Sequence, residues 1–114
     1  MKRIIFTALV CLMACTSKRD TPPENLISPD DMSKILADIH IAEAKTMLAG
    51  YKSIDSSNVA FAQLQKEILG KYKVSKRDYD SSYAYYSKHL EEYNKIYERT
   101  IDTLNMRQTR MADL

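Results

Sequence analysis

The chain of 114 residues has no tryptophan and only two phenylalanines, two glycines, three prolines and two cysteines. With so little glycine there is no glycine-rich loop to cradle a phosphate, and no cysteine–histidine cluster has metal-site spacing. Glycine and proline are the residues that most often interrupt helices, so their scarcity leaves long stretches free to be helical. No segment alternates apolar and polar residues with the period of two that is typical of strands. The sequence therefore predicts an all-α protein.

The one long apolar run lies at the start of the chain, where residues 4–14 follow the positive pair Lys2 and Arg3. A short apolar run behind positive charges is typical of a secretory signal. It is too short for a membrane-spanning helix, which needs roughly 20 apolar residues. We therefore predict a cleaved signal peptide at residues 1–14.

The run ends in Leu12-Met13-Ala14-Cys15, which resembles the lipobox of bacterial lipoprotein precursors. The resemblance implies that Cys15 receives a diacylglycerol thioether and that the new amine is acylated, for example with palmitate. The mature chain is then expected to bind a membrane through its N-terminal lipid. The alternative is an ordinary secretory signal that happens to end beside a cysteine.

Cleavage changes the charge balance and the cysteine count. The full sequence has 17 Lys and Arg against 15 Asp and Glu, and loss of Lys2 and Arg3 leaves 15 of each. A neutral chain gives no support for nucleic-acid binding. Cys11 leaves with the signal and lipid caps Cys15, so we expect neither a disulfide nor a free thiol. Packing alone must stabilise the folded domain.

After the anchor we expect a flexible tether, a small three-helix bundle with a long C-terminal third helix, and a disordered tail. Ser28 and Pro29 form a strong helix start, and Gly50 is a stop signal. The expected segments are the tether at 15–27, the domain at 28–108, its helices at 29–49, 58–72 and 76–107, and the tail at 109–114.

The third helix carries the clearest pattern, because apolar or tyrosine side chains recur at alternating spacings of three and four. At 1.5 Å per residue it is about 45 Å long, against about 30 Å and about 22 Å for its partners. One end is therefore expected to overhang, and it either docks a partner or a second copy, or frays. The stripe consists of Tyr79, Tyr83, Tyr86, Leu90, Tyr93, Tyr97, Ile101 or Thr100, and Leu104.

Glu43 is the polar residue that fits its helix least well. The apolar face of the first helix is expected to comprise Met32, Ile35, Leu36, Ile39, Ala42 and Met47. On a helical wheel Glu43 falls near the middle of that face, where an unpaired carboxylate is expensive to bury. Either His40 or tyrosine hydroxyls satisfy it, or this face is only partly covered. The functional alternative is a general acid or base with a raised pKa.

The tyrosines and the histidines each allow a structural and a functional interpretation. Tyrosines on a helical stripe are mostly core residues, although a tyrosine-lined ligand groove would show the same spacing. His40 and His89 each precede a glutamate by three residues, which places both side chains on one helix face. Carboxylate-bridged di-iron bundles use the reverse order and further glutamates that this chain lacks. We therefore expect no metal and no cofactor.

Three stretches resemble a family of small Bacteroidota lipoproteins that carry a domain of unknown function. They read Ile-Leu-Ala-Asp-Ile-His-Ile-Ala-Glu-Ala at 35–44, Tyr-Asp-Ser-Ser-Tyr-Ala-Tyr-Tyr at 79–86 and Glu-Asn-Leu-Ile-Ser at 24–28. The resemblance covers about residues 23–104 and implies no activity. The candidate interaction residues, most of them in these stretches, are Asp38, His40, Glu43, Tyr79, Tyr83, Tyr86 and Tyr93.

The residues after Cys15 bear on where the protein is placed. Thr16 at this position resembles outer-membrane sorting, and Lys18-Arg19 is unlike the acidic surface-export signals of this group. We therefore expect an outer-membrane lipoprotein that faces the periplasm. Its expected role is a non-catalytic interaction or scaffolding module that contacts an envelope protein or a second copy. The alternative is a binding protein for a small glycan or peptide in a tyrosine-lined groove around Glu43.

Overall fold

The computed structural model describes residues 20–114, so the expected signal peptide at 1–14 and Cys15 lie outside the described residues. The described part contains four α-helices and no strand, which confirms the all-α prediction. The helices are α1 (Pro29–Leu48), α2 (Ile54–Lys71), α3 (Lys76–Ser87) and α4 (Leu90–Ala112). Within this part of the chain, no helix is both long enough and apolar enough to cross a bilayer.

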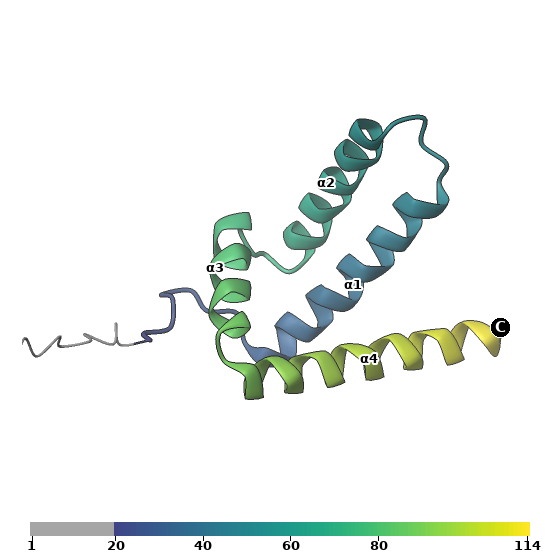
Figure 1. The fold of residues 1–114 in the computed structure, drawn as a ribbon. Helices are drawn as coiled ribbons and strands as arrows, with labels where there is room; N and C mark the ends of the chain where they lie inside the picture. Colours follow the sequence, from purple (N-terminus) through teal and green to yellow (C-terminus); the bar gives the residue numbers. More distant parts are fainter. Residues whose placement is uncertain (1–19) are drawn as a thin grey trace, which may run out of the picture.

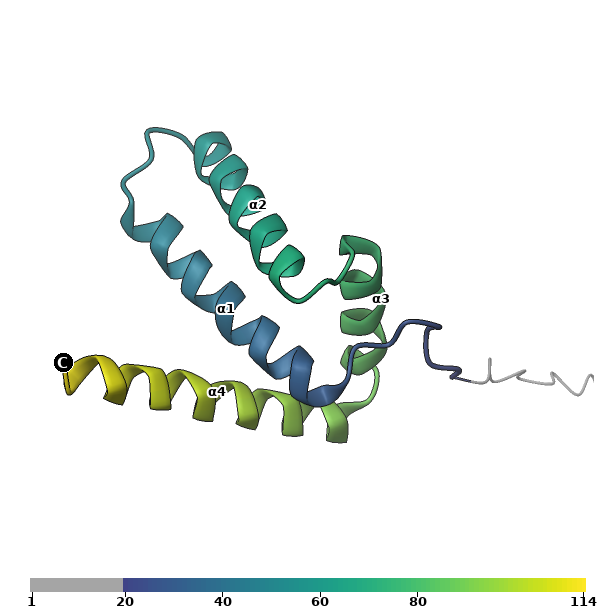
Figure 2. The same cartoon turned by 180° about the vertical axis from the view of Figure 1, so that it is seen from behind.

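The first helix is the centre of the arrangement. α1 packs against α2, which runs back alongside it, and against α4 (Figure 1). The short α3 contacts α2 and α4 and lies at the end where α1 begins. Seen from behind, α4 diverges from the α1–α2 hairpin toward its C-terminus (Figure 2). We call the end around α3 the closed end, and the opposite end, with the α1–α2 connection and the end of α4, the open end.

Serine side chains fix where the first three helices begin. Ser28 Oγ accepts the N–H of Asp31 at 3.2 Å, as predicted, and Ser75 Oγ accepts the N–H of Asp78 at 3.0 Å, so that α3 begins at the expected residue 76. α2 begins earlier than expected, at Ile54, because Ser53 accepts the N–H of Ser56 at 3.1 Å.

Gly50 was correctly predicted to stop α1. It has a φ of 66° and directly follows the C-cap residue Ala49. A residue without a Cβ adopts this left-handed conformation at no steric cost. The chain can therefore leave α1 sharply and turn back into α2.

The prediction of one long third helix is wrong, because the helix breaks at Lys88 and His89 into α3 and α4. His89 leaves the helical region with φ −113° and ψ 81°. Its Nδ1 lies 2.6 Å from the carbonyl oxygen of Tyr85, and its ring stacks on the Tyr85 ring. The N–H of Lys88 donates to the same carbonyl at 3.1 Å, so the histidine side chain adds a second contact at this helix end. The break thus ends α3 and lets α4 leave in a new direction.

Breaking the helix changes which residues of the expected stripe are buried. Leu90 and Ile101 are exposed, whereas Ile96 and Thr100 lie in the core. On α1, Met47 is 82% exposed, so its predicted place on the apolar face is wrong. Thr46 takes the buried position one turn after Ala42. The remaining core prediction for α1 is confirmed, with Met32, Ile35, Leu36, Ile39 and Ala42 all buried.

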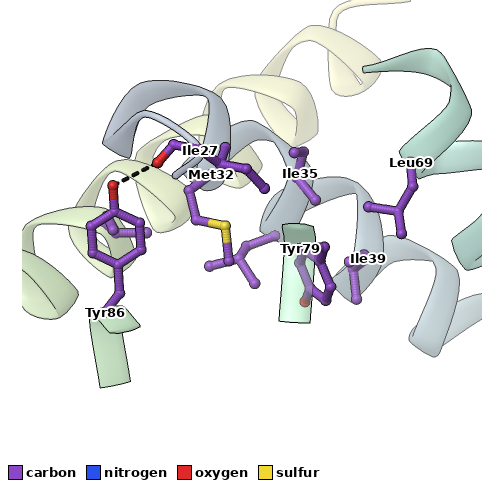
Figure 3. Packing of buried hydrophobic residues seen from close by; sticks show 9 residues of the cluster. Ile27, Met32, Ile35, Ile39, Leu69, Tyr79 and Tyr86 are labelled. Carbon is purple, nitrogen blue, oxygen red and sulfur yellow. Dashed lines mark hydrogen bonds between the residues drawn. The ribbon is translucent and has the colours of Figure 1, made fainter. Parts of the chain in front are cut away.

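Ile27 lies before α1 but belongs to the core (Figure 3). Its N–H donates to Ser82 Oγ at 3.0 Å, and its carbonyl accepts the Tyr86 hydroxyl at 2.6 Å. The expected tether at 15–27 is therefore wrong at its C-terminal end. Buried backbone outside a helix needs hydrogen-bond partners, and two side chains of α3 supply them.

α4 remains helical to Ala112, so the tail expected from residue 109 begins later. The expected overhang is present, because the last turns of α4 extend past the helices that cover its start. Large apolar side chains are exposed there and on the α1–α2 hairpin. These open-end residues are Met47, Leu48, Ile54, Val59, Met106 and Met111.

Removing the Tyr86 hydroxyl is expected to weaken the attachment of α3. Tyr86→Phe leaves the buried carbonyl of Ile27 without its donor, which costs about 1–2 kcal/mol of unfolding free energy. Urea unfolding of the purified protein measures the loss. Tyr51→Phe, at an exposed tyrosine, is the matched control and should change stability by less than about 0.5 kcal/mol. Equal effects of the two substitutions would contradict the assigned role of Tyr86.

Candidate functional site

Asp38 is the most heavily bonded carboxylate in the described structure. Its side chain is 13% exposed and faces donors from two other helices. The Tyr72 hydroxyl donates to Oδ2 at 2.7 Å, and Lys71 Nζ lies 3.3 Å from the same oxygen. Arg107 Nη1 donates to Oδ1. We call these four residues the Asp38 cluster; it joins α1 to the end of α2 and to the far half of α4.

Charge within the cluster favours the ionised form of Asp38. Burial alone raises the pKa of this carboxyl, but hydrogen bonds from Tyr72, Arg107 and Lys71 outweigh it and hold the pKa below its usual range. Burial, and then the hydrogen bond to Asp38, raises the pKa of Tyr72 to about 12. The hydrogen bond to Asp38 also raises the pKa of Arg107. The group therefore stays an ion pair with a neutral phenol at ordinary pH.

The way α2 ends brings Lys71 and Tyr72 to Asp38. Lys73 adopts φ 55°, and the next N–H, that of Val74, bonds to the carbonyl of Leu69 at 3.0 Å. This is the Schellman arrangement, in which the residue with positive φ is usually glycine. Here it is lysine, which costs roughly 1 kcal/mol relative to glycine. The turn ends α2 directly after the two residues that reach Asp38 and leads the chain into α3.

Most of the candidate tyrosines form a second group, between α3 and α4. The ring centroids of Tyr79 and Tyr83 are 6.2 Å apart, those of Tyr83 and Tyr93 6.5 Å, and those of Tyr93 and Tyr97 4.6 Å. Such separations are typical of favourable aromatic pairs. Tyr79 is buried, whereas the other three are half-buried. We call these four residues the tyrosine cluster.

Three hydroxyls of the tyrosine cluster, those of Tyr79, Tyr83 and Tyr97, have raised pKa values and are held in the neutral form. Burial raises the pKa of Tyr79 to about 12. A hydrogen bond with Tyr93 raises the pKa of Tyr83, and the pKa of Tyr97 rises for the same first reason, with burial second. Neutral phenols can donate and accept hydrogen bonds but are poor bases at ordinary pH.

Glu43 is not buried, so its expected place at the centre of the apolar face is wrong. Its side chain is 50% exposed, and Oε2 lies 3.4 Å from His40 Nδ1. Beyond Ala42 the buried arc of α1 passes through Thr46, which leaves Glu43 on the solvent side. His40 approaches Tyr97 with a centroid distance of 6.3 Å. The pair therefore borders the tyrosine cluster at the surface, whereas Tyr86 lies apart, bonded to Ile27.

His89 connects the end of α3 to the segment before α1. Considering it as a possible metal ligand did not identify this role. Its Nδ1 faces the Tyr85 carbonyl, and its Nε2 lies 2.8 Å from Asp20 Oδ2. Glu92 does not join this contact. Among residues 20–114, no three histidine, cysteine or acidic side chains come together as a metal site.

Asp38 itself lies in a sequence stretch already noted, but its partners were missed. Lys71 and Tyr72 are 33 and 34 residues away, and Arg107 is 69 residues away. The position of Asp38 beside the buried Ile35 and Ile39 was a signal that it needed partners. No local pattern indicated which side chains would supply them.

Comparison with known proteins gives one result. A family model described as "Domain of unknown function (DUF4296)" matches residues 23–110, which is most of the chain. Neither the curated proteins nor the solved structures gave a match. The match begins close to Ile27 and includes both the Asp38 cluster and the tyrosine cluster.

The contribution of Asp38 to stability should depend on pH. Its folded-state pKa is lowered, so its stabilising effect is complete above the unfolded value of about 3.9 and is lost as the pH falls through the folded value. We expect Asp38→Asn to reduce the unfolding free energy at neutral pH by about 2 kcal/mol.

The difference between wild type and Asp38→Asn should shrink below about pH 4, as urea unfolding at a series of pH values would measure. Asp102→Asn, at an exposed aspartate of α4, is the control and should behave like wild type at each pH. A difference for Asp38→Asn that stays constant from neutral to acid pH would contradict the charged role of this carboxylate.

Proposed function

The chain belongs to the family of the domain of unknown function DUF4296, and on that premise we propose that it is a lipid-anchored, non-catalytic interaction module of the cell envelope. The anchor is the lipid on Cys15, and the membrane is the outer membrane, on its periplasmic face. The module contacts an envelope protein or a second copy through its open end.

The residues at the start of the chain support the anchor. Lys2 and Arg3, the apolar run and Leu12-Met13-Ala14-Cys15 follow the order of a lipoprotein signal. Two or more acyl chains make a stable anchor, whereas one chain binds only marginally. A membrane attachment of this kind is also compatible with a folded domain whose helices are all too polar or too short to span the bilayer.

The exposed apolar residues of the open end carry the proposal of an interaction surface. Met47 and Leu48 are 82% and 87% exposed at the end of α1, and Ile54 is equally open at the start of α2. On α4, Met106 and Met111 face solvent. Several large apolar side chains exposed at one end of a domain favour a protein contact site there. Additional burial would also benefit a domain this small, whose own core is limited.

The state of the candidate residues supports a role without catalysis. Asp38 accepts three donors and its pKa is lowered, which makes it a weak base. Tyr72 and Tyr79 have pKa values raised to about 12, so neither supplies a ready nucleophile. The chemistry of the Asp38 cluster is that of a structural connection between three helices.

A second candidate function is the binding of a small glycan or peptide beside Glu43. The observation that favours it is the exposure of the Glu43–His40 pair next to the half-buried rings of Tyr83, Tyr93 and Tyr97. Aromatic faces bordered by a carboxylate can combine apolar contact with hydrogen bonding. Glu43 lies one turn of α1 before Met47, so the experiment that distinguishes the two functions uses Leu48 and Met111 rather than Met47.

Substitution of the predicted lipidation site tests the anchor. Cys15→Ala removes the only sulfur that can accept the lipid after cleavage, so the protein should leave the membrane fraction and lose labelling by a radioactive fatty acid. Cys11→Ala is the matched control and should remain membrane-bound. Unchanged membrane association of Cys15→Ala would mean that the start of the chain was misinterpreted.

Site-specific photo-crosslinking in living cells tests the interaction surface. A photoreactive residue at Leu48 or Met111 should give a discrete protein adduct, either of twice the mass of the chain or with another protein. Gln63, exposed on the middle of α2, is the control position and should give none. An adduct at Glu43 alone would favour the second candidate, and the absence of adducts at Leu48 and Met111 would refute the open-end surface.

A further inference from the structure

A groove with an apolar floor lies between the last turns of α2 and the start of α3. Its volume is about 550 Å³, within the range of roughly 300–1,000 Å³ that small-molecule sites occupy. Ala62, Leu69, Gly70 and Val74 line it. α3 contacts α2 at the closed end, so the groove lies at the end of the molecule opposite the α1–α2 connection (Figure 1).

Gly70 is the residue whose presence the fold itself does not explain. It lies inside α2, where glycine destabilises a helix by about 1 kcal/mol relative to alanine. Its φ is not positive, and a Cβ added there would meet no atom within 4 Å. The residue in this turn that does adopt a positive φ is Lys73. Glycine at 70 therefore serves neither the turn nor the packing, and its effect is to keep the groove open.

Positive charge surrounds this apolar floor. Lys66 of α2 and Lys76 of α3 both line the groove. Among residues 20–114, Lys66 makes no ion pair, and Lys76 uses one contact, at 2.8 Å, on Asp80. The segment 66–77 contains five lysines and arginines and a single glutamate. A ligand that fits must combine an apolar body with an anionic group, because buried apolar surface and a paired charge would satisfy both features.

We propose that the groove between α2 and α3 binds one acyl chain whose anionic headgroup lies between Lys66 and Lys76. The chain contacts Leu69, Val74 and the bare backbone of Gly70. The headgroup is a carboxylate or a phosphate, from a free fatty acid or from an anionic phospholipid. This site is separate from the lipid on Cys15 and from the surface assigned to protein contacts.

The proposal can be tested on the full chain, purified from membranes in a non-ionic detergent. Extraction with organic solvent releases a non-covalent lipid, whereas lipid on Cys15 stays with the polypeptide, so mass spectrometry distinguishes the two. We expect about one anionic acyl lipid per chain, and the mass of its headgroup identifies a fatty acid or a phospholipid. Recovery of neutral lipid only, or of no lipid from the wild type, would overturn the proposal.

Variants of Gly70 separate filling of the groove from stabilisation of the helix. Gly70→Leu and Gly70→Ala both remove the helix penalty, but only the leucine side chain fills the groove. Gly70→Leu should reduce the recovered lipid at least about tenfold relative to Gly70→Ala. Equal recovery from the two variants would place the lipid elsewhere.

Charge reversal tests the headgroup position. Lys66→Glu should weaken binding about tenfold, whereas Lys52→Glu, in the exposed α1–α2 connection, should leave it unchanged. Direct titration of the delipidated chain uses three probes: myristate, dodecanol and inorganic phosphate. Myristate alone should bind tightly. Dodecanol binding as tightly as myristate, or equal effects of the two lysine substitutions, would refute the requirement for an anion.

Discussion

The orientation of α3 depends on two hydrogen bonds to one residue outside any helix. Ile27 places its side chain in the core, so its N–H and carbonyl lose water and need partners inside the protein. Ser82 and Tyr86, one turn apart on α3, supply an acceptor and a donor. Because both partners lie on the same helix, they fix the direction of α3 against the start of α1. The position at which α4 begins follows from that direction.

The Asp38 cluster fixes the second half of the arrangement. One carboxylate joins α1 to the end of α2 and to α4, and three donors compensate its burial. Buried ion pairs add little net stability over apolar contacts, but they can select one alignment of helices among several. A slide of α4 along α1 by one turn would separate Arg107 from Asp38. Together with the hydrogen bond from Thr100 Oγ1 to the Ser33 carbonyl at 3.3 Å, the cluster thus sets the register between α1 and α4.

Local signals in the sequence predicted the helices well. Ser28, Ser75 and Gly50 act within a few residues of themselves, so the sequence alone was enough to place the helix ends that they control. The break at His89 escaped prediction because the tyrosine spacing continues across it. The break depends on a side chain that bonds back to the Tyr85 carbonyl, while helical periodicity describes only which face is apolar.

The candidate site was predictable only in part, for a related reason. Asp38 and the tyrosines were identified from the sequence, because each belongs to a pattern within one segment. Asp38 lies in the stretch at 35–44, and the tyrosines lie on one helical stripe. Glu43 was misplaced, because its exposure is set by where α2 and α4 stop covering α1. The donors to Asp38 and the groove beside Gly70 are made by segments from different helices. A single sequence does not show which segments of different helices contact each other.

If Cys15 carries the proposed lipid, docking of Ile27 also limits how far the domain can stand from the bilayer. Four residues, 16–19, separate Cys15 from Asp20, the first residue described, and the five Cα–Cα steps between them span at most about 17 Å. A connection of this length would keep Asp20, and the end of α3 that it contacts through His89, close to the surface to which Cys15 is attached. The protein would act as a spacer of nearly fixed reach, selecting partners by their distance from the membrane as well as by their chemistry.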